Sequence, residues 1–191
     1  MVIFLEFKIN IFYFSTEVGH KKIVLERLQS EKRIYVSKKQ TLKNTFNLKL
    51  EKVSLTDSHT KLACEWLDKN RNKFKGEIFY PIITQINVIS PEYVPFVESA
   101  LGGQDMSTFL FEDNIDLQTF CDLLDKECQI RVNVAMLPRN FGIEDCDRSF
   151  DISQFKSYGI TNSIRDLITA PNQVMAYLCK TYHINHVPLG K

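Results

Sequence analysis

The chain has 191 residues, of which 44% are hydrophobic and 12% aromatic, and its formal net charge at pH 7 is +1. This composition excludes a disordered chain, and the length allows one globular core of ordinary size plus an appendage. The small net charge hides an uneven distribution, because residues 21–75 carry a net charge of +9 and residues 76–191 a net charge of −7. A basic segment before an acidic folded one is typical of a stem that faces nucleic acid, and it is equally compatible with a solvated helical face.

The cysteines indicate a reducing compartment. Their number is odd, no C-x-x-C motif occurs and no secretory signal precedes them, so we expect reduced thiols in a cytosolic or nuclear protein. The five are Cys64, Cys121, Cys128, Cys146 and Cys179.

The chain begins with an apolar run, VIFLEFKINIFYF (residues 2–14), which is interrupted by Glu6, Lys8 and Asn10. The run is too short and too polar to span a bilayer and lacks the basic start of a signal peptide, so we expect no membrane association. Its alternating pattern could indicate a β-strand. Residues 1–19 are therefore left unassigned to a domain.

Residues 20–75 are expected to form a basic helical arm. This span contains neither proline nor glycine. Its leucines recur at intervals of seven, at Leu48, Leu55 and Leu62, and Trp66 lies about one turn further on. That spacing predicts a long helix with an apolar seam, as in a coiled coil, which needs a partner to bury the seam.

Residues 79–136 alternate between strand-like and helix-like patterns. Short runs rich in β-branched or aromatic residues predict strands, and apolar residues spaced three and four apart predict helices. Ser90 and the proline after it indicate a helix start, and Gly102 its end. The expected order is a strand at 81–88, a helix at 91–101, a strand at 107–111, a helix that ends at Cys128 and a strand at 129–136.

A polar loop without apolar periodicity is expected at 138–153, then helices at about 162–169 and 171–182 and a final strand or turn at 183–190. Strand, helix, strand, helix, strand is the signature of right-handed crossover units. We therefore predict an α/β fold with a mixed, largely parallel sheet and flanking helices, preceded by the long helix. Residues 76–191 would form its globular body.

The sequence lacks the motifs of common catalytic and nucleotide-binding sites. Its glycines do not form G-x-G-x-x-G or G-x-x-x-x-G-K-[ST], and there is no G-x-S-x-G elbow. Four acids of the polar loop lack EF-hand spacing and are expected to be solvated rather than catalytic. They are Glu144, Asp145, Asp147 and Asp151. We expect no catalytic residues, no enzymatic activity and no cofactor.

One cluster has the spacing of metal ligands. Cys179, His183 and His186 form C-x3-H-x2-H, which could bring three ligands near one point. A structural zinc site needs a fourth ligand, and no second Cys/His pair completes it. Packing at a helix end is the favoured interpretation, so we predict no metal site.

Four cations alternate with polar and aromatic residues where the arm meets the body. They are Lys69, Arg71, Lys73 and Lys75. Four positive charges in seven residues can neutralise backbone phosphates in a salt-sensitive, sequence-independent way, and a nearby aromatic ring can stack on an unpaired base. The alternative is that Trp66 and Phe74 pack against the core while the cations stay in water.

Three stretches carry longer motifs. CEWLDKNRNKFKGEIFYPIITQINV (64–88) contains Trp-Leu, Asn-Arg and Phe-Lys pairs before a P-I-x-x-x-I-N run, and SYGITNSIRDLITAPNQVMAYLCKTYHINHVPLG (157–190) ends as YLC-x-x-YHI-x-x-VP-x-G. FLFEDNIDLQTFCDLLDKECQIRVNVAMLP (109–138) supplies a strand, helix, strand spacing between them. Together they resemble the hinge of the structural maintenance of chromosomes (SMC) protein 5 family, over about residues 62–190.

This resemblance implies that residues 76–191 are the first of two hinge subdomains, with the second truncated. It implies a non-catalytic role in pairing with the hinge of a partner, SMC protein 6, within a complex that acts on chromosomes in the nucleus in recombinational DNA repair. Family DNA binding at the junction of hinge and arms carries over only to Lys69, Arg71, Lys73 and Lys75, and the DNA is expected to be single-stranded. The surface that faces the partner hinge is not indicated.

A second interpretation comes from a different functional class. The chain could be a free-standing module that binds single-stranded DNA through its basic arm. A small α/β enzyme would need a pocket with convergent titratable groups, and the sequence offers no such constellation.

Overall fold

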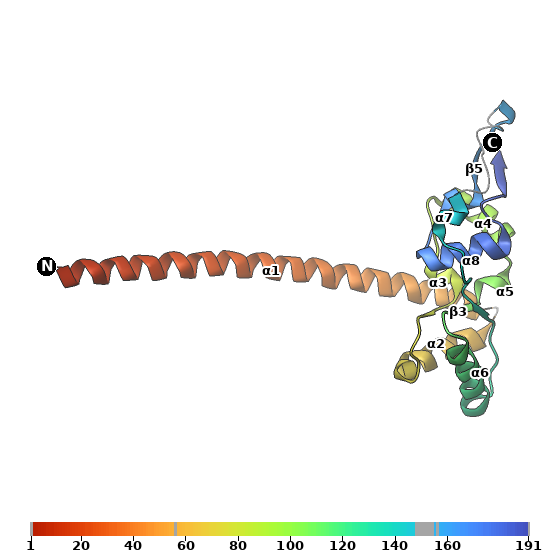
Figure 1. Ribbon diagram of the computed structural model, residues 1–191, viewed down its shortest axis with the longest axis horizontal. Helices are drawn as coiled ribbons and strands as arrows, with labels where there is room; N and C mark the ends of the chain where they lie inside the picture. The colour runs from red at the N-terminus through yellow and green to blue at the C-terminus, as the bar shows by residue number, and fades with distance from the viewer. Residues whose placement is uncertain (1, 56, 148–154, 156, 191) are drawn as a thin grey trace. The chain divides into compact units, whose positions relative to one another are not determined.

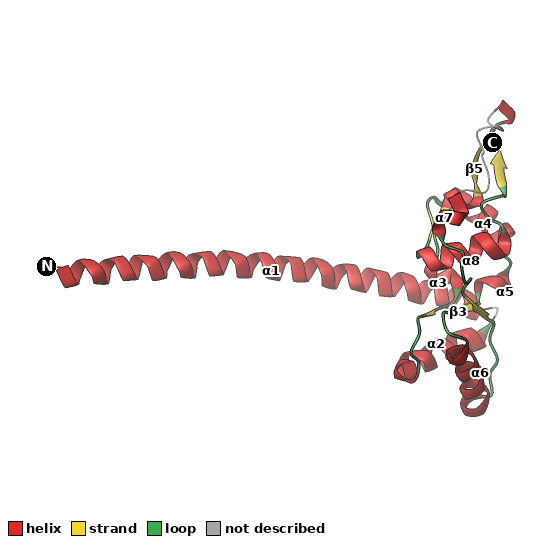
Figure 2. Cartoon of the chain, in the orientation of Figure 1, coloured by secondary structure: helices red, strands yellow, loops and turns green. Residues whose placement is uncertain are grey.

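A computed structural model describes residues 2–55, 57–147, 155 and 157–190, with side chains from residue 17 onward except that of Thr161. The chain forms two compact units, Met1–Asn47 and Leu48–Lys191. Figure 1 follows the elements from red at the N-terminus to blue at the C-terminus. Figure 2 shows that the second unit consists mainly of helices and loops around short strands.

Helix α1 (Val2–Ser54) contributes residues to both units. Ion pairs spaced four residues apart support its exposed surface, Lys21–Glu17 at 2.7 Å and Arg27–Glu31 at 3.0 Å. Residues 2–14 are helical, so the strand interpretation of that run is wrong. None of the described helices is long and apolar enough to cross a membrane.

The expected helical span at 20–75 is divided into two helices. α1 ends at Ser54, and α2 (Ser58–Asn70) begins after Asp57, whose carboxylate accepts the amides of His59 and Thr60 at 3.1 and 3.3 Å. An aspartate at this position satisfies amides that lack an intrahelical partner and so fixes a new helix start. A turn of 3₁₀ helix, η1 (Arg71–Lys73), follows α2.

The body is built on a three-stranded mixed sheet with the order β1-β3-β4. β1 (Ile78–Phe79) pairs antiparallel with β3 (Phe109–Phe111), and β3 pairs parallel with β4 (Val134–Met136). α6 (Asn114–Cys128) is the crossover between β3 and β4, and the Asp113 carboxylate caps it. The strand, helix, strand order over residues 107–136 is therefore confirmed, as is the mixed sheet. The expected largely parallel pairing is wrong, because one of the two pairings in this sheet is antiparallel.

Two segments differ from their predicted structure. Residues 81–88 form α3 (Ile82–Gln85) and β2 (Asn87–Val88) rather than one strand. Residues 162–169 form the end of β5 (Ile160–Ser163), the 3₁₀ helix η4 (Ile164–Leu167) and β6 (Ile168–Thr169) rather than a helix. In the second segment the antiparallel pairing of β5 with β7 and of β6 with β2, between residues distant in the sequence, overrides the local helical preference.

Several predicted elements are confirmed. η2 (Pro91–Tyr93) and α4 (Val94–Ala100) occupy the predicted helix at 91–101, α8 (Asn172–Tyr182) occupies 171–182, and β7 (Pro188–Gly190) ends the chain paired antiparallel with β5. The remaining short helices are α5 (Gly103–Met106) and α7 (Ile143–Asp147). The rest of the expected polar loop, 148–153, lies outside the described residues.

Five aromatic rings form a core between α2, α6 and the sheet. Phe120 is fully buried, and its ring centroid lies 5.1 and 5.3 Å from those of Phe111 and Phe109 and 6.0 and 6.1 Å from those of Trp66 and Phe74. Offset and edge-on aromatic pairs at these separations stabilise a fold beyond their buried area. A second, aliphatic cluster covers the other elements of the body and includes Ile82, Val97, Leu101, Leu110 and Leu178.

We predict that Phe120→Ala destabilises the body by about 3–5 kcal/mol, because it leaves a cavity where the four other rings meet. Urea denaturation followed by circular dichroism measures the loss. The control is Ile115→Ala on the same helix, whose side chain is 71% exposed and whose removal should change the free energy of unfolding by less than about 0.5 kcal/mol. Equal effects of the two substitutions would contradict the aromatic core.

Candidate functional site

The four predicted cations lie at the end of α2, in η1 and in the segment before β1. The side chains of Lys69 and Lys75 are exposed to solvent. Arg71 is half-buried, and its guanidinium donates to the carbonyl of Gly76 at 2.9 Å. The ammonium of Lys73 pairs with the carboxylate of Glu127 at 3.3 Å. The structure therefore brings the four residues onto one short segment, but two of them have partners within the chain.

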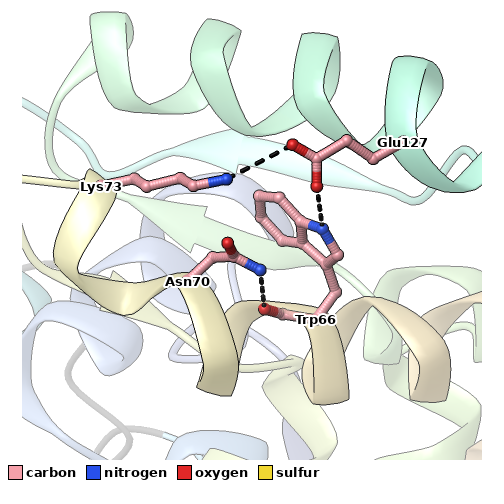
Figure 3. A network of polar contacts seen from close by, with 4 residues as sticks. All are labelled: Trp66, Asn70, Lys73 and Glu127. Carbon is pink, nitrogen blue, oxygen red and sulfur yellow. Dashed lines mark hydrogen bonds and ion pairs between the residues drawn. The ribbon is translucent and has the colours of Figure 1, made fainter.

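Glu127, on α6, holds two groups of this segment at once (Figure 3). Its Oε2 accepts the indole N–H of Trp66 at 2.8 Å, and its Oε1 accepts the ammonium of Lys73. The Lys73 Nζ also lies 5.2 Å from the centre of the Trp66 ring, within range of a cation–π contact. The Trp66 hydrogen bond and the Lys73 charge hold the pKa of the Glu127 carboxyl below its usual range, so the carboxylate stays ionised at neutral pH.

Trp66 and Phe74 are buried in the aromatic core. Both rings lie edge-on to Phe120, and the indole N–H is already bonded to Glu127. The packing interpretation of these two aromatics is therefore confirmed, and neither ring offers a face on which a base could stack. Binding of nucleic acid at this segment would depend on charge alone.

The chain between η1 and β1 is fixed by the buried carboxylate of Asp116. Its Oδ2 accepts the amides of Lys75 and Gly76 at 2.9 and 2.6 Å. A Cβ at position 76 would lie 3.2 Å from the Cβ of Asp113 and 3.3 Å from Asp116 Oδ2, so a glycine allows this close approach. The backbone that carries the exposed Lys75 is thus held against the start of α6.

A groove of about 620 Å³ lies beside the last turns of α1 in the second unit, and the sequence analysis missed it. Its wall is mostly aliphatic, and Lys49 and Lys52 stand within it. Lys49 donates to the carbonyl of Ile86 and to Asn87 Oδ1, and burial lowers the pKa of its ammonium. Lys52 pairs with Glu98 at 2.8 Å. No sequence signal marked this groove, because its two lysines are among many in a basic helix.

The residues with metal-ligand spacing lie at the end of α8. Cys179 is buried, His183 adopts a left-handed conformation with φ +52° just after the helix, and the rings of His183 and His186 are 5.9 Å apart. Within the described part of the chain, no group of three His, Cys, Asp or Glu side chains is arranged to hold a metal ion.

The acids of the expected polar loop do not form a catalytic pair. Glu144, Asp145 and Asp147 lie on α7, where the Asp145 carboxylate accepts the amide of Gly142 at 2.8 Å and so starts that short helix. Asp151 lies outside the described residues.

The five cysteines are free thiols with different exposures, and this generates a prediction. Burial, with the nearby Asp68 and Glu65, raises the pKa of Cys64 to about 12, whereas Cys128 is exposed at the end of α6. Because the thiolate is the reactive form, an aromatic disulfide reagent at pH 8 should modify Cys128 quickly and Cys121 slowly. Cys64, Cys146 and Cys179 should react only after unfolding. Cys128→Ser should remove the fast phase, and a fast phase that survives this change would contradict the structure.

Comparison with known proteins finds relatives in one family. The chain is 25% identical over 132 residues to structural maintenance of chromosomes protein 5 of Caenorhabditis elegans, covering 67% of this chain and 12% of the relative. It is 27% identical over 172 residues to the protein of the same name from Arabidopsis thaliana, covering 86% of this chain and 16% of the relative. The chain thus spans less than a fifth of these relatives. No family model matches the sequence.

Comparison of the structure identifies the fold. The hinge domain of Smc5/6 from S. pombe superposes with a TM-score of 0.73 and 16% identity, over 80% of this chain and 56% of that chain. The mixed sheet with flanking helices and the long helix before it are the features that the sequence predicted for an SMC hinge. The chain therefore has the fold of the S. pombe Smc5/6 hinge domain and is similar in sequence to part of structural maintenance of chromosomes protein 5.

Proposed function

We propose that the chain acts as a non-catalytic joint, which pairs with the hinge of an SMC protein 6 partner in a complex on chromosomes in the nucleus. The observation that carries the proposal is the fold shared with the S. pombe Smc5/6 hinge domain over four-fifths of the chain. In such a complex the chain would contribute to recombinational DNA repair and chromosome maintenance through association rather than turnover.

The titratable groups with shifted pKa values support a non-catalytic role. Burial and a hydrogen bond to Asp68 raise the pKa of Tyr80, and burial with a hydrogen bond to Asp105 raises that of Tyr182. Neither tyrosine lines the groove beside α1. Catalytic sites bring such groups together in one cleft. Among the described residues, the groove beside α1 holds one group with a shifted pKa, Lys49, whose ammonium is already bonded to Ile86 and Asn87.

Sedimentation velocity tests the association. The chain mixed with the hinge of an SMC protein 6 should form a one-to-one complex with a dissociation constant of about 1 μM or tighter, as a specific interface of standard size allows. Each partner run alone controls for self-association. Independent sedimentation of the two at about 100 μM would rule out pairing through this chain.

We further propose that Lys69 and Lys75 bind the backbone of single-stranded DNA without regard to sequence. Both side chains are exposed, Lys69 in the last turn of α2 and Lys75 on a backbone that Asp116 fixes. The backbone at both positions is therefore already ordered before DNA binds. The same two lysines would bind DNA if the chain were a free-standing DNA-binding module. The two interpretations differ in whether the chain also pairs with a partner hinge.

The double variant Lys69→Ala/Lys75→Ala should weaken binding to labelled oligothymidylate about fivefold to tenfold at low salt. It should also make the negative slope of log affinity against log salt shallower by about 1.4, because two phosphate contacts are lost. Fluorescence anisotropy over a salt series measures both quantities. Arg139→Ala/Lys180→Ala removes the same charge from other exposed positions and should leave the slope unchanged. Equal behaviour of the two double variants would exclude Lys69 and Lys75 as the contacts.

A further inference from the structure

Glu127 forms an ion pair with Lys73, a solvent-exposed cation of the short segment that carries Lys69, Arg71, Lys73 and Lys75, here called the basic segment. The side chains of Lys73 and Glu127 are 40% and 43% exposed, and their charged atoms are 3.3 Å apart. Lys69 and Lys75 on either side are exposed as well, so a phosphate chain that follows them would pass Lys73. The carboxylate lies where a phosphate oxygen would otherwise bind.

We propose that Glu127 is an intramolecular competitor for nucleic-acid phosphate, which withholds Lys73 from the DNA-binding segment until a phosphate displaces it. The inference rests on the proposed DNA-binding function and adds a regulating residue from a different element, α6. Displacement leaves Lys73 with a phosphate as its partner, and Glu127 keeps its hydrogen bond from Trp66.

The two oxygens of Glu127 have separable roles, and this makes the exchange feasible. Oε2 binds the buried indole N–H at 2.8 Å, and this bond holds the side chain over α2. Oε1 binds Lys73 at the longer distance of 3.3 Å in an exposed ion pair. Exposed pairs of this kind are weak and are screened by salt, so a phosphate backbone already held by neighbouring lysines can replace the carboxylate. Figure 3 shows Lys73 and Trp66 bonded to different oxygens of the Glu127 carboxylate.

The remaining cation of the segment is held differently. Arg71 donates to the backbone carbonyl of Gly76. This carbonyl carries no negative charge, so the positive charge of the guanidinium is not neutralised. Among the described members of the segment, Lys73 is therefore the cation whose charge is cancelled by an acid from another element.

Glu127→Gln removes the negative charge of the side chain and keeps its size and shape. The amide oxygen of glutamine can still accept the Trp66 indole N–H, whereas its neutral head no longer cancels the charge of Lys73. The matched control is Asp125→Asn on the same helix, which removes the same charge from an exposed pair with Arg131 at 3.3 Å, outside the basic segment.

We expect Glu127→Gln to tighten binding of labelled oligothymidylate about twofold to fivefold at low salt. It should also make the negative slope of log affinity against log salt steeper by about 0.7, the value of one added phosphate contact. Asp125→Asn should leave the slope at the wild-type value. In a Lys73→Ala background, Glu127→Gln should have no effect. An unchanged slope in Glu127→Gln, or equal effects of the two charge-removing variants, overturns the inference.

A measurement on the unaltered chain tests the inference even if the Glu127→Gln variant does not fold. Trp66 is the only tryptophan of the chain, and displacement of Lys73 from the carboxylate and ring should shift its emission when unlabelled oligothymidylate is added. Lys73→Ala should abolish that shift. Binding that depends on Lys69 and Lys75 with no Trp66 response would overturn the role of Glu127 and leave the proposed function intact. Absence of any DNA binding by the wild-type chain would overturn both.

Discussion

The burial of Phe120 between the sheet and α2 is the interaction on which the rest of the body depends. The phenyl ring contacts two aromatic residues of β3, and also Trp66 just before the basic segment and Phe74 within it. One side chain of α6 therefore joins α2 to the sheet. Because Trp66 and Phe74 are both buried in this core, the last turn of α2 and η1 between them are held at both ends, and this sets where Lys69 and Lys73 lie.

This constraint connects the fold to the proposed function. A non-catalytic hinge has to hold its partners in place rather than catalyse a reaction. A segment that is held by buried aromatic rings suits that task. The same constraint removes the aromatic faces that a single-strand binding site commonly uses, so any contact with DNA depends on cations. Those cations lie beside an acidic body, since residues 76–191 carry a net charge of −7, and Glu127 is an acid of that body that pairs with one of them, Lys73.

Much of the fold could be predicted from residue patterns because the decisive signals are local. The apolar spacing in α6 and α8 and the aromatic run of β3 are each set within one element. The pairing of β2 with β6 is not, since it joins Asn87 to Thr169 across 82 residues. The division between α1 and α2 does have a local signal, an aspartate at 57 followed by two polar residues, but the leucine repeat continues through it and masks the new helix start.

The candidate site was predictable only in part for the same reason. The four cations are adjacent in sequence and could be identified as a group. The acid that pairs with Lys73 comes from α6. Glu127 lies 61 residues from Trp66, and no periodicity links the two. Whether Trp66 is buried or available could not be decided without the position of Phe120.

Hydrogen–deuterium exchange of the folded chain tests the central claim most directly, which is that α2 belongs to the same cooperative unit as α6 and β3. If Phe120 joins them, the amides of Cys64 and Leu67 in α2 should exchange with the same free energy of opening as those of Phe120 and Leu124 in α6 and of Leu110 in β3. Exchange of the α2 amides at the rate of an exposed helix, while those of α6 and β3 stay protected, would contradict the account.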